Sequence, residues 1–300
     1  MDLRQLRYVE AVARRASFTR AAEELHVAQP ALSLTIRSLE AELGVRLFDR
    51  TSRRVRPTDA GEALAGEARR ILREADQIVD RMAEYAGAVR GRVTVSIWYH
   101  LDPDLPRLLR DFVTGNPHVQ VSIVELPAPK TIAALRAGEL DFGLVAAFPG
   151  LELTGLETTV VWEAPLELAV VPGHPLASRR SVSLAELGDT PLIVTSPATA
   201  QRAWLDLALA QAGVRPRVVL ETNELAAAVT YTSIGIGATM LFRRVIEAMR
   251  VEVAIVPMDE APTVRMLLVW DPTRELGPAA ARALAFARNA APDRGAGRDS

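Results

Sequence analysis

The residues near the start of the chain that are best suited to chemistry are spaced along one edge of an expected helix. That edge, opposite the apolar stripe, carries Gln29, Pro30, Ser33, Leu34 and Arg37. An amide such as Gln29 suits adenine, Arg37 can reach guanine or phosphate, and an apolar side chain can touch a thymine methyl. This set is typical of a helix that contacts base edges in the major groove of DNA. The alternative is an ordinary solvated helix face.

A strongly basic segment follows this helix. Residues 46–56 contain five arginines and a single acidic residue, Asp49. Leu47 and Phe48 can anchor the segment while alternate residues project outward, as in a short hairpin. Phosphate contacts supply most of the non-specific affinity of DNA-binding proteins, so an arginine-rich hairpin beside such a helix favours DNA binding. The arginines assigned to the interface are Arg50, Arg53 and Arg54, and the alternative is a solvated charge run.

Three short helices are expected to position these side chains. The first has an apolar face made of Leu3, Leu6, Val9 and Ala13. The second begins at the hydroxyl residues of segment 17–19 and runs to Leu25. The third begins near residue 28 or 29, because a proline at position 30 fits only a first helical turn, and it ends before Gly44. Its expected buried stripe is Leu32, Ile36, Leu39 and Leu43.

A long helix is expected after this head. Apolar or small residues alternate in steps of three and four, which is a heptad seam: Gly61, Leu64, Ala68, Ile71, Ala75, Ile78, Met82, Tyr85 and Val89. The regularity favours a helix that packs against its copy, and therefore a homodimer. The alternative is one amphipathic helix lying on its own domain.

From residue 91 onward, strands alternate with helices. Strands are expected at 93–97, 119–124 and 141–145, separated by helices at 104–114 and 131–137. This order builds a parallel sheet. The adjacent β-rich runs 158–162 and 166–171 flank Pro165, where the chain could cross to a second lobe. Further strands are expected at 192–195, 217–220, 236–238, 253–255 and 264–270, with helices at 197–212, from 225, and at 279–290.

Two loops of this body are candidates for ligand contact. Each follows a strand and precedes a helix, where free N–H groups attract anions. The better anion site is rich in hydroxyls and supplies Thr195, Ser196 and Thr199. The other supplies Trp98, Tyr99 and His100 for stacking or polar contact, although Asp102 and Asp104 disfavour an anion there. The expected ligand is a small effector with an aromatic or apolar body and a carboxylate; the alternatives are helix capping and ordinary packing.

Several runs at fixed spacing also carry a family resemblance. They are residues 17–25 (SFTRAAEEL), 29–33 (QPALS), 36–40 (IRSLE), 43–50 (LGVRLFDR) and 58–61 (TDAG). Together they closely resemble the winged helix-turn-helix of LysR-type transcriptional regulators. Residues 138–141, 173–177 and 235–237 extend the resemblance more loosely through the body.

The resemblance implies an all-α winged helix-turn-helix head at residues 1–58 and a dimerising linker helix at 59–90. It implies a two-lobed α/β domain, like a periplasmic binding protein, at 91–300. Lobe I would comprise about 91–162 and 265–300, and lobe II about 163–264. The implied function is a sequence-specific DNA-binding regulator controlled by a small-molecule effector bound between the lobes. Tetramers are common in the family, and RNA polymerase is a candidate partner.

Family positions also assign individual residues. Gln29, Pro30, Ser33, Leu34 and Arg53 fall where the family touches DNA. Leu34 is apolar where a basic or polar residue is frequent, which favours a base methyl over a phosphate. Ala28 replaces a frequent serine, which weakens the expected helix cap. Further effector positions are Pro127, Ala128, Ala147, Phe148, Thr222 and Asn223.

The net charge of −2 is the sum of a positive N-terminal part and a negative remainder of the chain. Residues 1–92 contain 17 arginines and 14 acidic residues, whereas residues 93–300 contain 18 basic and 23 acidic residues. The mildly acidic total therefore excludes only a uniformly basic protein. It is compatible with a DNA-binding head joined to an acidic body.

The composition predicts a cytoplasmic protein without a metal or a resident cofactor. The chain contains no cysteine, which excludes disulfides, cysteine-based metal sites and thiol nucleophiles. Residues 1–7 lack the apolar run of a secretory signal, and the longest uncharged stretch, residues 225–241, is shorter than the roughly 20 residues of a membrane span.

Two other functions compete with regulation. An enzyme is disfavoured because three of the four histidines fall in turns of the chain and no phosphate loop or metal spacing is present. A transport binding protein is disfavoured by the missing signal segment and by the arginine-rich hairpin.

Overall fold

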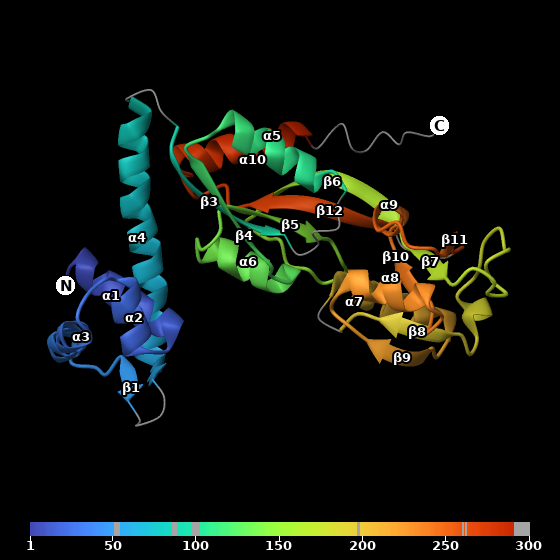
Figure 1. Ribbon diagram of the computed structural model, residues 1–300, viewed down its shortest axis with the longest axis horizontal. Coiled ribbons are helices and arrows are strands. Elements are labelled where there is room, and N and C mark those ends of the chain that lie inside the picture. The colour runs from blue at the N-terminus through green and yellow to red at the C-terminus, as the bar shows by residue number, and fades with distance from the viewer. Residues whose placement is uncertain are drawn as a thin grey trace. The chain divides into compact units, whose positions relative to one another are not determined.

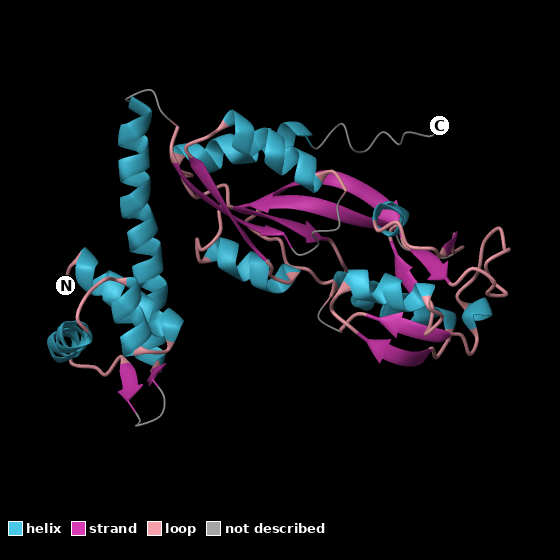
Figure 2. Cartoon of the chain, viewed as in Figure 1, coloured by secondary structure: helices cyan, strands magenta, loops and turns pink. Residues whose placement is uncertain are grey.

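The structure is a computed structural model that describes residues 1–50, 55–85, 89–97, 103–196, 199–259, 261 and 263–290. The chain divides into two compact units (Figures 1 and 2). The first comprises residues 1–91, 137–139 and 276–278, and the second comprises 92–136, 140–275 and 279–300. None of the helices in the described part of the chain is long and apolar enough to cross a membrane.

The first unit is a helical head with a β-hairpin and a long helix. Its elements are α1 (Leu3–Arg15), α2 (Phe18–Glu24), α3 (Gln29–Leu43), β1 (Phe48–Arg50), β2 (Val55–Pro57) and α4 (Asp59–Tyr85). Leu32, Ile36 and Leu39 of α3 are fully buried in its core, as their spacing predicts. Leu43 is 40% exposed, so its expected place in the buried stripe is wrong: the last turn of α3 extends past the core.

Local caps explain where the head's helices begin and end. The Ser17 side chain accepts a hydrogen bond from the Arg20 N–H at the start of α2. The N-cap of α3, Ala28, makes no side-chain hydrogen bond, as its methyl side chain predicts. Gly44 ends α3 in the left-handed conformation with φ of 69°, which glycine adopts without a steric penalty.

The first half of α4 packs against the head. Ala65 and Ala68 are fully buried there, and a Cβ atom at Gly61 would lie 1.9 Å from the Leu47 carbonyl oxygen. The second half exposes apolar side chains, with Ile78 at 54% and Met82 at 58% exposure. The helix is described to Tyr85, and residues 86–88 of the expected linker lie outside the described residues.

Lobe I of the second unit is built on a five-stranded mixed sheet in the order β4-β3-β5-β12-β6. The strands are β3 (Gly91–Ile97), β4 (Val119–Val124), β5 (Phe142–Ala146), β6 (Glu157–Pro165) and β12 (Thr263–Trp270). β3 and β5 are parallel, as the order of elements predicts, but β12 is antiparallel to β5 and to β6. One face carries α5 (Leu105–Gly115) and α10 (Pro278–Ala290), and the other carries α6 (Ala128–Arg136) (Figure 1).

Lobe II contains two smaller groups of strands. β7 (Glu167–Val170) lies between β10 (Thr239–Leu241) and β11 (Ala254–Val256), and β8 (Pro191–Val194) is parallel to β9 (Arg217–Glu221). The helices are η1 (Ala185–Leu187), α7 (Ala200–Ala212), α8 (Leu225–Ser233) and α9 (Arg243–Ala248). The strand expected at 236–238 lies three residues later, because Ile236 is in an exposed turn whereas Thr239, Met240 and Leu241 are buried.

Candidate nucleic-acid interface and effector site

The outer edge of α3 presents most of the residues predicted to contact bases. Gln29 and Pro30 in its first turn are exposed, and so are Arg37 and Leu34, the latter at 68%. Ser33 does not share this edge: it is only 8% exposed, so its expected outward position is wrong. It precedes Ile36 by three residues and therefore lies on the inner side of the helix.

The hairpin beside α3 is attached to that helix by half-buried hydrogen bonds. The carboxylate of Glu40 accepts hydrogen bonds from the N–H groups of Leu47 and Phe48, at 2.9 and 3.2 Å. The Phe48 ring also meets the Phe18 ring edge-on, with centroids 5.8 Å apart. These contacts hold the base of the hairpin rigidly relative to the outer edge of α3.

Three arginines of the basic segment 46–56 lie within the described residues, and one of them, Arg50, is a predicted phosphate contact. Arg46 and Arg56 are exposed, and Arg56 is opposite Asp49 in the hairpin register. Arg50 ends β1, where it pairs with Val55. Arg53 and Arg54 lie outside the described residues.

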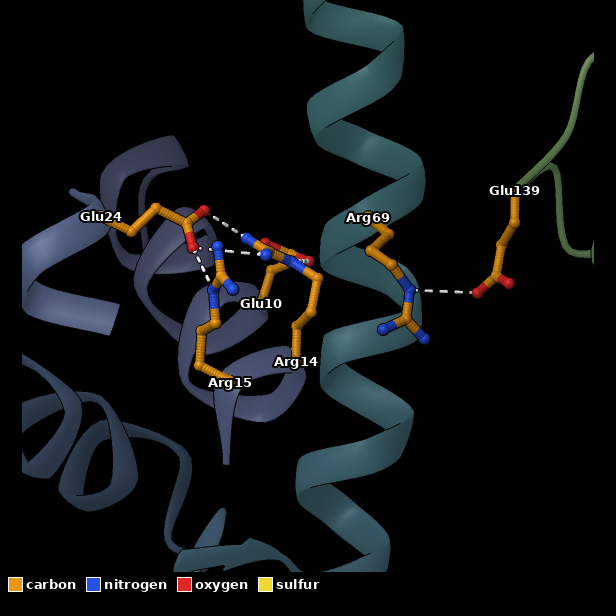
Figure 3. A network of polar contacts seen from close by, with 6 residues as sticks. All are labelled: Glu10, Arg14, Arg15, Glu24, Arg69 and Glu139. Atoms are coloured by element: carbon orange, nitrogen blue, oxygen red, sulfur yellow. Dashed lines mark hydrogen bonds and ion pairs between the residues drawn. The ribbon is translucent and has the colours of Figure 1, made fainter. Parts of the chain in front are cut away.

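A charge network stiffens the head (Figure 3). Glu24 of α2 binds Arg14 and Arg15 of α1, the latter at 2.5 Å, and Arg14 also binds Glu10 at 2.8 Å. Hydrogen bonds first from Arg14 and then from Arg15 lower the pKa of Glu24 to about 2. In the same unit, Arg69 of α4 binds Glu139 at 3.0 Å.

The hydroxyl-rich loop of lobe II lies at the carboxyl ends of β8 and β9 and at the N-terminus of α7. The Ser196 N–H donates to the Asn223 side-chain oxygen at 3.3 Å, and the Thr222 N–H donates to the Val194 carbonyl at 3.0 Å. These bonds bring two predicted segments, 195–199 and 222–223, together. Ser196 and Thr222 are half-buried and Asn223 is exposed, so their polar groups are available to a ligand.

The two threonine side chains of this loop bond to each other, and one of them also caps α7. Thr195 and Thr199 are 3% and 4% exposed, and their hydroxyl oxygens are 2.6 Å apart. The Thr199 hydroxyl also accepts the Arg202 N–H at 3.2 Å and thereby caps α7. Helix capping, which was the alternative to ligand contact for this loop, is therefore observed in the structure.

A positively charged side chain, that of Arg202, also lies in this region, although it was not among the residues predicted from the sequence. Its guanidinium donates to the Thr195 carbonyl at 3.0 Å, and it forms ion pairs with Asp206 at 2.7 Å and Glu221 at 3.4 Å. Its side chain is only 18% exposed. Its place in the first turn of a helix that begins at Thr199 is a signal that could have identified it.

Lobe I supplies the remaining candidates at the ends of its strands. Pro127 follows β4 and Phe148 follows β5, and both are half-buried. The indole N–H of Trp204 in α7 donates to the Ala147 carbonyl at 3.0 Å, which joins lobe II to lobe I beside Phe148. Trp98, Tyr99 and His100 lie outside the described residues.

A second contact between the lobes involves Arg244 of α9. Its guanidinium donates to the Asp104 carboxylate at 3.0 Å and lies 5.0 Å from the ring centroid of Trp162. Two helices of lobe II, α7 and α9, thus each make a polar contact with lobe I. Neither was predicted, because each partner is far from the other in the sequence.

Comparisons with known proteins agree with this architecture. Residues 3–62 match the family model described as "Bacterial regulatory helix-turn-helix protein, lysR family", and residues 86–292 match "LysR substrate binding domain". The chain belongs to the LysR family of transcriptional regulators. The resemblance stated from the sequence and the expected fold class are therefore confirmed. This LysR-type protein is a transcriptional regulator with a DNA-binding head and a substrate-binding body.

The relatives of this LysR-type regulator match it over most of their length. It is 31% identical to the HTH-type transcriptional regulator XapR of Escherichia coli (strain K12), covering 95% of this chain and 96% of that protein. It is 32% identical to the HTH-type transcriptional regulator AlsR of Bacillus subtilis (strain 168), covering 80% of each. Full-length CbnR in complex with its target DNA is 28% identical with a TM-score of 0.71, covering 97% of this chain and all of that one.

Proposed function

We propose that this regulator recognises a specific operator through the outer edge of α3 and the arginine-rich hairpin. The observation that carries the proposal is the exposed set Gln29, Leu34 and Arg37 beside a hairpin fixed by Glu40. Gln29 and Leu34 contact base edges, Pro30 sets the first turn, and Arg37 binds guanine or phosphate. Arg50, Arg53 and Arg54 bind phosphates.

Paired substitutions separate base contacts from phosphate contacts. Gln29→Ala should relax the preference at one operator position, whereas Arg53→Ala should weaken binding to every sequence and reduce the salt slope by about one. Arg110→Ala in α5 removes an exposed arginine from lobe I and is the matched control. The assay is fluorescence anisotropy on operator variants at several salt concentrations. Unchanged footprints and slopes in both variants would rule out the assignment.

A small-molecule effector bound between the lobes controls this DNA binding. Its anionic group lies at the start of α7, near Ser196, Thr222 and Asn223, with Thr195 and Thr199 holding the loop in shape. Its aromatic or apolar body contacts the lobe I residues Pro127 and Phe148 and the aromatic loop Trp98, Tyr99 and His100. The position of this loop at the N-terminus of α7, the positive end of the helix dipole, supports the anion assignment.

Benzoate is a suitable probe for this site. Ser196→Ala and Asn223→Ala should each weaken its binding at least about fivefold, the effect of one hydrogen bond of about 1 kcal/mol. Thr230→Ala, which removes a hydroxyl bonded to the Ala226 carbonyl within α8, is the control. Calorimetric titration that gives equal affinities for all four proteins would exclude this loop as the effector contact.

The regulator acts as a homodimer paired through α4, and pairs of dimers form a tetramer. An effector that binds two lobe arrangements with different affinity shifts the packing of the subunits, and α4 transmits the shift to the spacing of the two α3 helices on DNA. The bound complex contacts RNA polymerase in the cytoplasm. A titration in which no small metabolite alters affinity, bend or footprint would contradict this coupling.

A further inference from the structure

Lobe I contains an apolar cavity of about 100 Å³ that is partly open to solvent. Its floor is one face of the five-stranded sheet, with Val95, Val121 and Leu268 among the lining residues. Its roof consists of α5 and α10, which lie side by side over that face (Figure 1). The described lining comes from lobe I and includes none of the described residues assigned to the effector.

The sequence of α10 explains why space remains beneath it. Ala283 and Ala287, one turn apart, both line the cavity, and a methyl group fills less space there than a larger apolar side chain would. On the same helix, the Phe286 ring packs on Phe112 of α5 with centroids 5.4 Å apart. This aromatic pair holds the two helices over the sheet and keeps the cavity from collapsing.

The polarity of the lining defines the chemistry of an occupant. Among the described residues that line the cavity, Ser96 alone is polar, and its hydroxyl already pairs with the Thr131 hydroxyl at 2.8 Å. A charged or hydroxylated molecule would lose hydrogen bonds to water and find no partner here. An apolar cavity of comparable size in other proteins stays dry and accepts benzene.

Half-buried side chains at the edge provide a route of entry. Leu105 and Leu108 of α5 and Phe286 of α10 line the cavity while remaining partly exposed. A ligand can therefore reach the cavity by rotation of these side chains, without separation of the sheet from its helices.

We propose that this cavity is a second ligand site, which binds one small, uncharged, apolar molecule of the size of a monocyclic hydrocarbon. Its ligand class differs from that of the effector loops, where a helix N-terminus and polar side chains select a polar group. The site is complete within lobe I, so its occupancy depends on neither DNA nor the interlobe ligand.

Fluorobenzene is the probe, observed by ¹⁹F NMR with the full-length protein. We expect saturable binding at a single site, and phenol should bind at least tenfold more weakly because its hydroxyl finds no partner. In protein with labelled leucine and valine methyl groups, fluorobenzene should shift Val95 and Leu268 and leave Leu168, in the core of lobe II, unchanged.

Alanine-to-leucine substitutions along α10 provide the matched test. Ala287→Leu fills the cavity and should weaken fluorobenzene binding more than tenfold. Ala285→Leu makes the same change on the exposed side of the helix and should leave the affinity within twofold. Ala283→Leu is a second filling variant at a fully enclosed position, and circular dichroism reports whether each variant is folded. Absence of saturable binding, or equal affinity in the Ala287 and Ala285 variants, would overturn the proposal.

Discussion

The exposed apolar half of α4 allows a quantitative test of dimerisation. Ile78 and Met82 are four residues apart on the predicted seam and are 54% and 58% exposed. Complete burial of such a side chain is worth about 1.5–3 kcal/mol, so burying the exposed part contributes about 0.8–1.7 kcal/mol for each. Two residues from each of two chains therefore supply about 3–7 kcal/mol to a helix pair.

The perturbation is the double substitution Ile78→Glu with Met82→Glu. It removes this apolar burial and places four like charges in the seam, so the dissociation constant of the α4 pair should rise at least about a thousandfold, the equivalent of 4 kcal/mol. Sedimentation velocity of the full-length chain measures the loss, as a halving of the particle mass at micromolar concentration.

Two control variants separate the seam from a general effect of mutation. Met82→Leu keeps an apolar side chain and should retain the native mass. Ala63→Glu places a carboxylate on an exposed position of the same helix outside the seam and should also retain it. A double variant with the native mass and native affinity for a two-site operator would refute pairing through α4.

The remaining predictions concern a glycine, an ion pair and the charge of the effector site. Gly61→Ala should destabilise the head by about 1–3 kcal/mol in urea unfolding, because the new Cβ would overlap the Leu47 carbonyl. Glu24→Gln should lower stability at pH 7 by less than about 1 kcal/mol, since the pair is partly solvated. The pKa of Glu24 is lowered from 4.5 to about 2, so the stabilisation is complete above pH 4.5 and disappears as the pH falls through about 2. Glu221→Gln should raise the ratio of benzoate to benzamide affinity, because it releases Arg202 from one ion pair.

Matched variants control each of these tests. Gly66→Ala lies on the same helix with no atom within 4 Å of the new Cβ, and should stabilise by about 0.5–1 kcal/mol. Glu23→Gln changes the exposed residue next to Glu24, and it should leave the pH dependence of the midpoint of urea unfolding unchanged. Glu224→Gln, at the start of α8, should leave the benzoate to benzamide ratio unchanged. Equal effects within any of these pairs would contradict the corresponding argument.

Hydrophobic periodicity predicted the elements that are long enough to show it. The stripe Leu32, Ile36 and Leu39 located α3, and the alternation in residues 119–124 located β4, because burial on one face imposes a period on the sequence. α9 has only six residues, too few for a helical period to be distinct, and it was missed. Ser33 was misplaced because a residue at the border of a helical face can point to either side.

The contacts that complete the sites are not encoded locally. Trp204 and Ala147 are 57 residues apart, and Arg244 and Asp104 are 140 apart, so no spacing rule joins them. Glu40 was recognised only as part of a family run, yet its carboxylate fixes the hairpin. Sequence patterns located the segments that bear function, whereas the partners of each polar group depend on tertiary packing.

The partners of Arg202 also bear on how the effector's charge is recognised. Asp206 and Glu221 both pair with its guanidinium, so the region around the start of α7 has a cation whose charge is already compensated. The attraction for a carboxylate then comes mainly from the N–H groups and dipole of the helix, which are worth about 0.3–1 kcal/mol. This contribution of the helix raises the affinity for an anion above that for a neutral amide by less than about tenfold. The shape and apolar surface of the effector must therefore supply most of the discrimination, through lobe I residues such as Phe148.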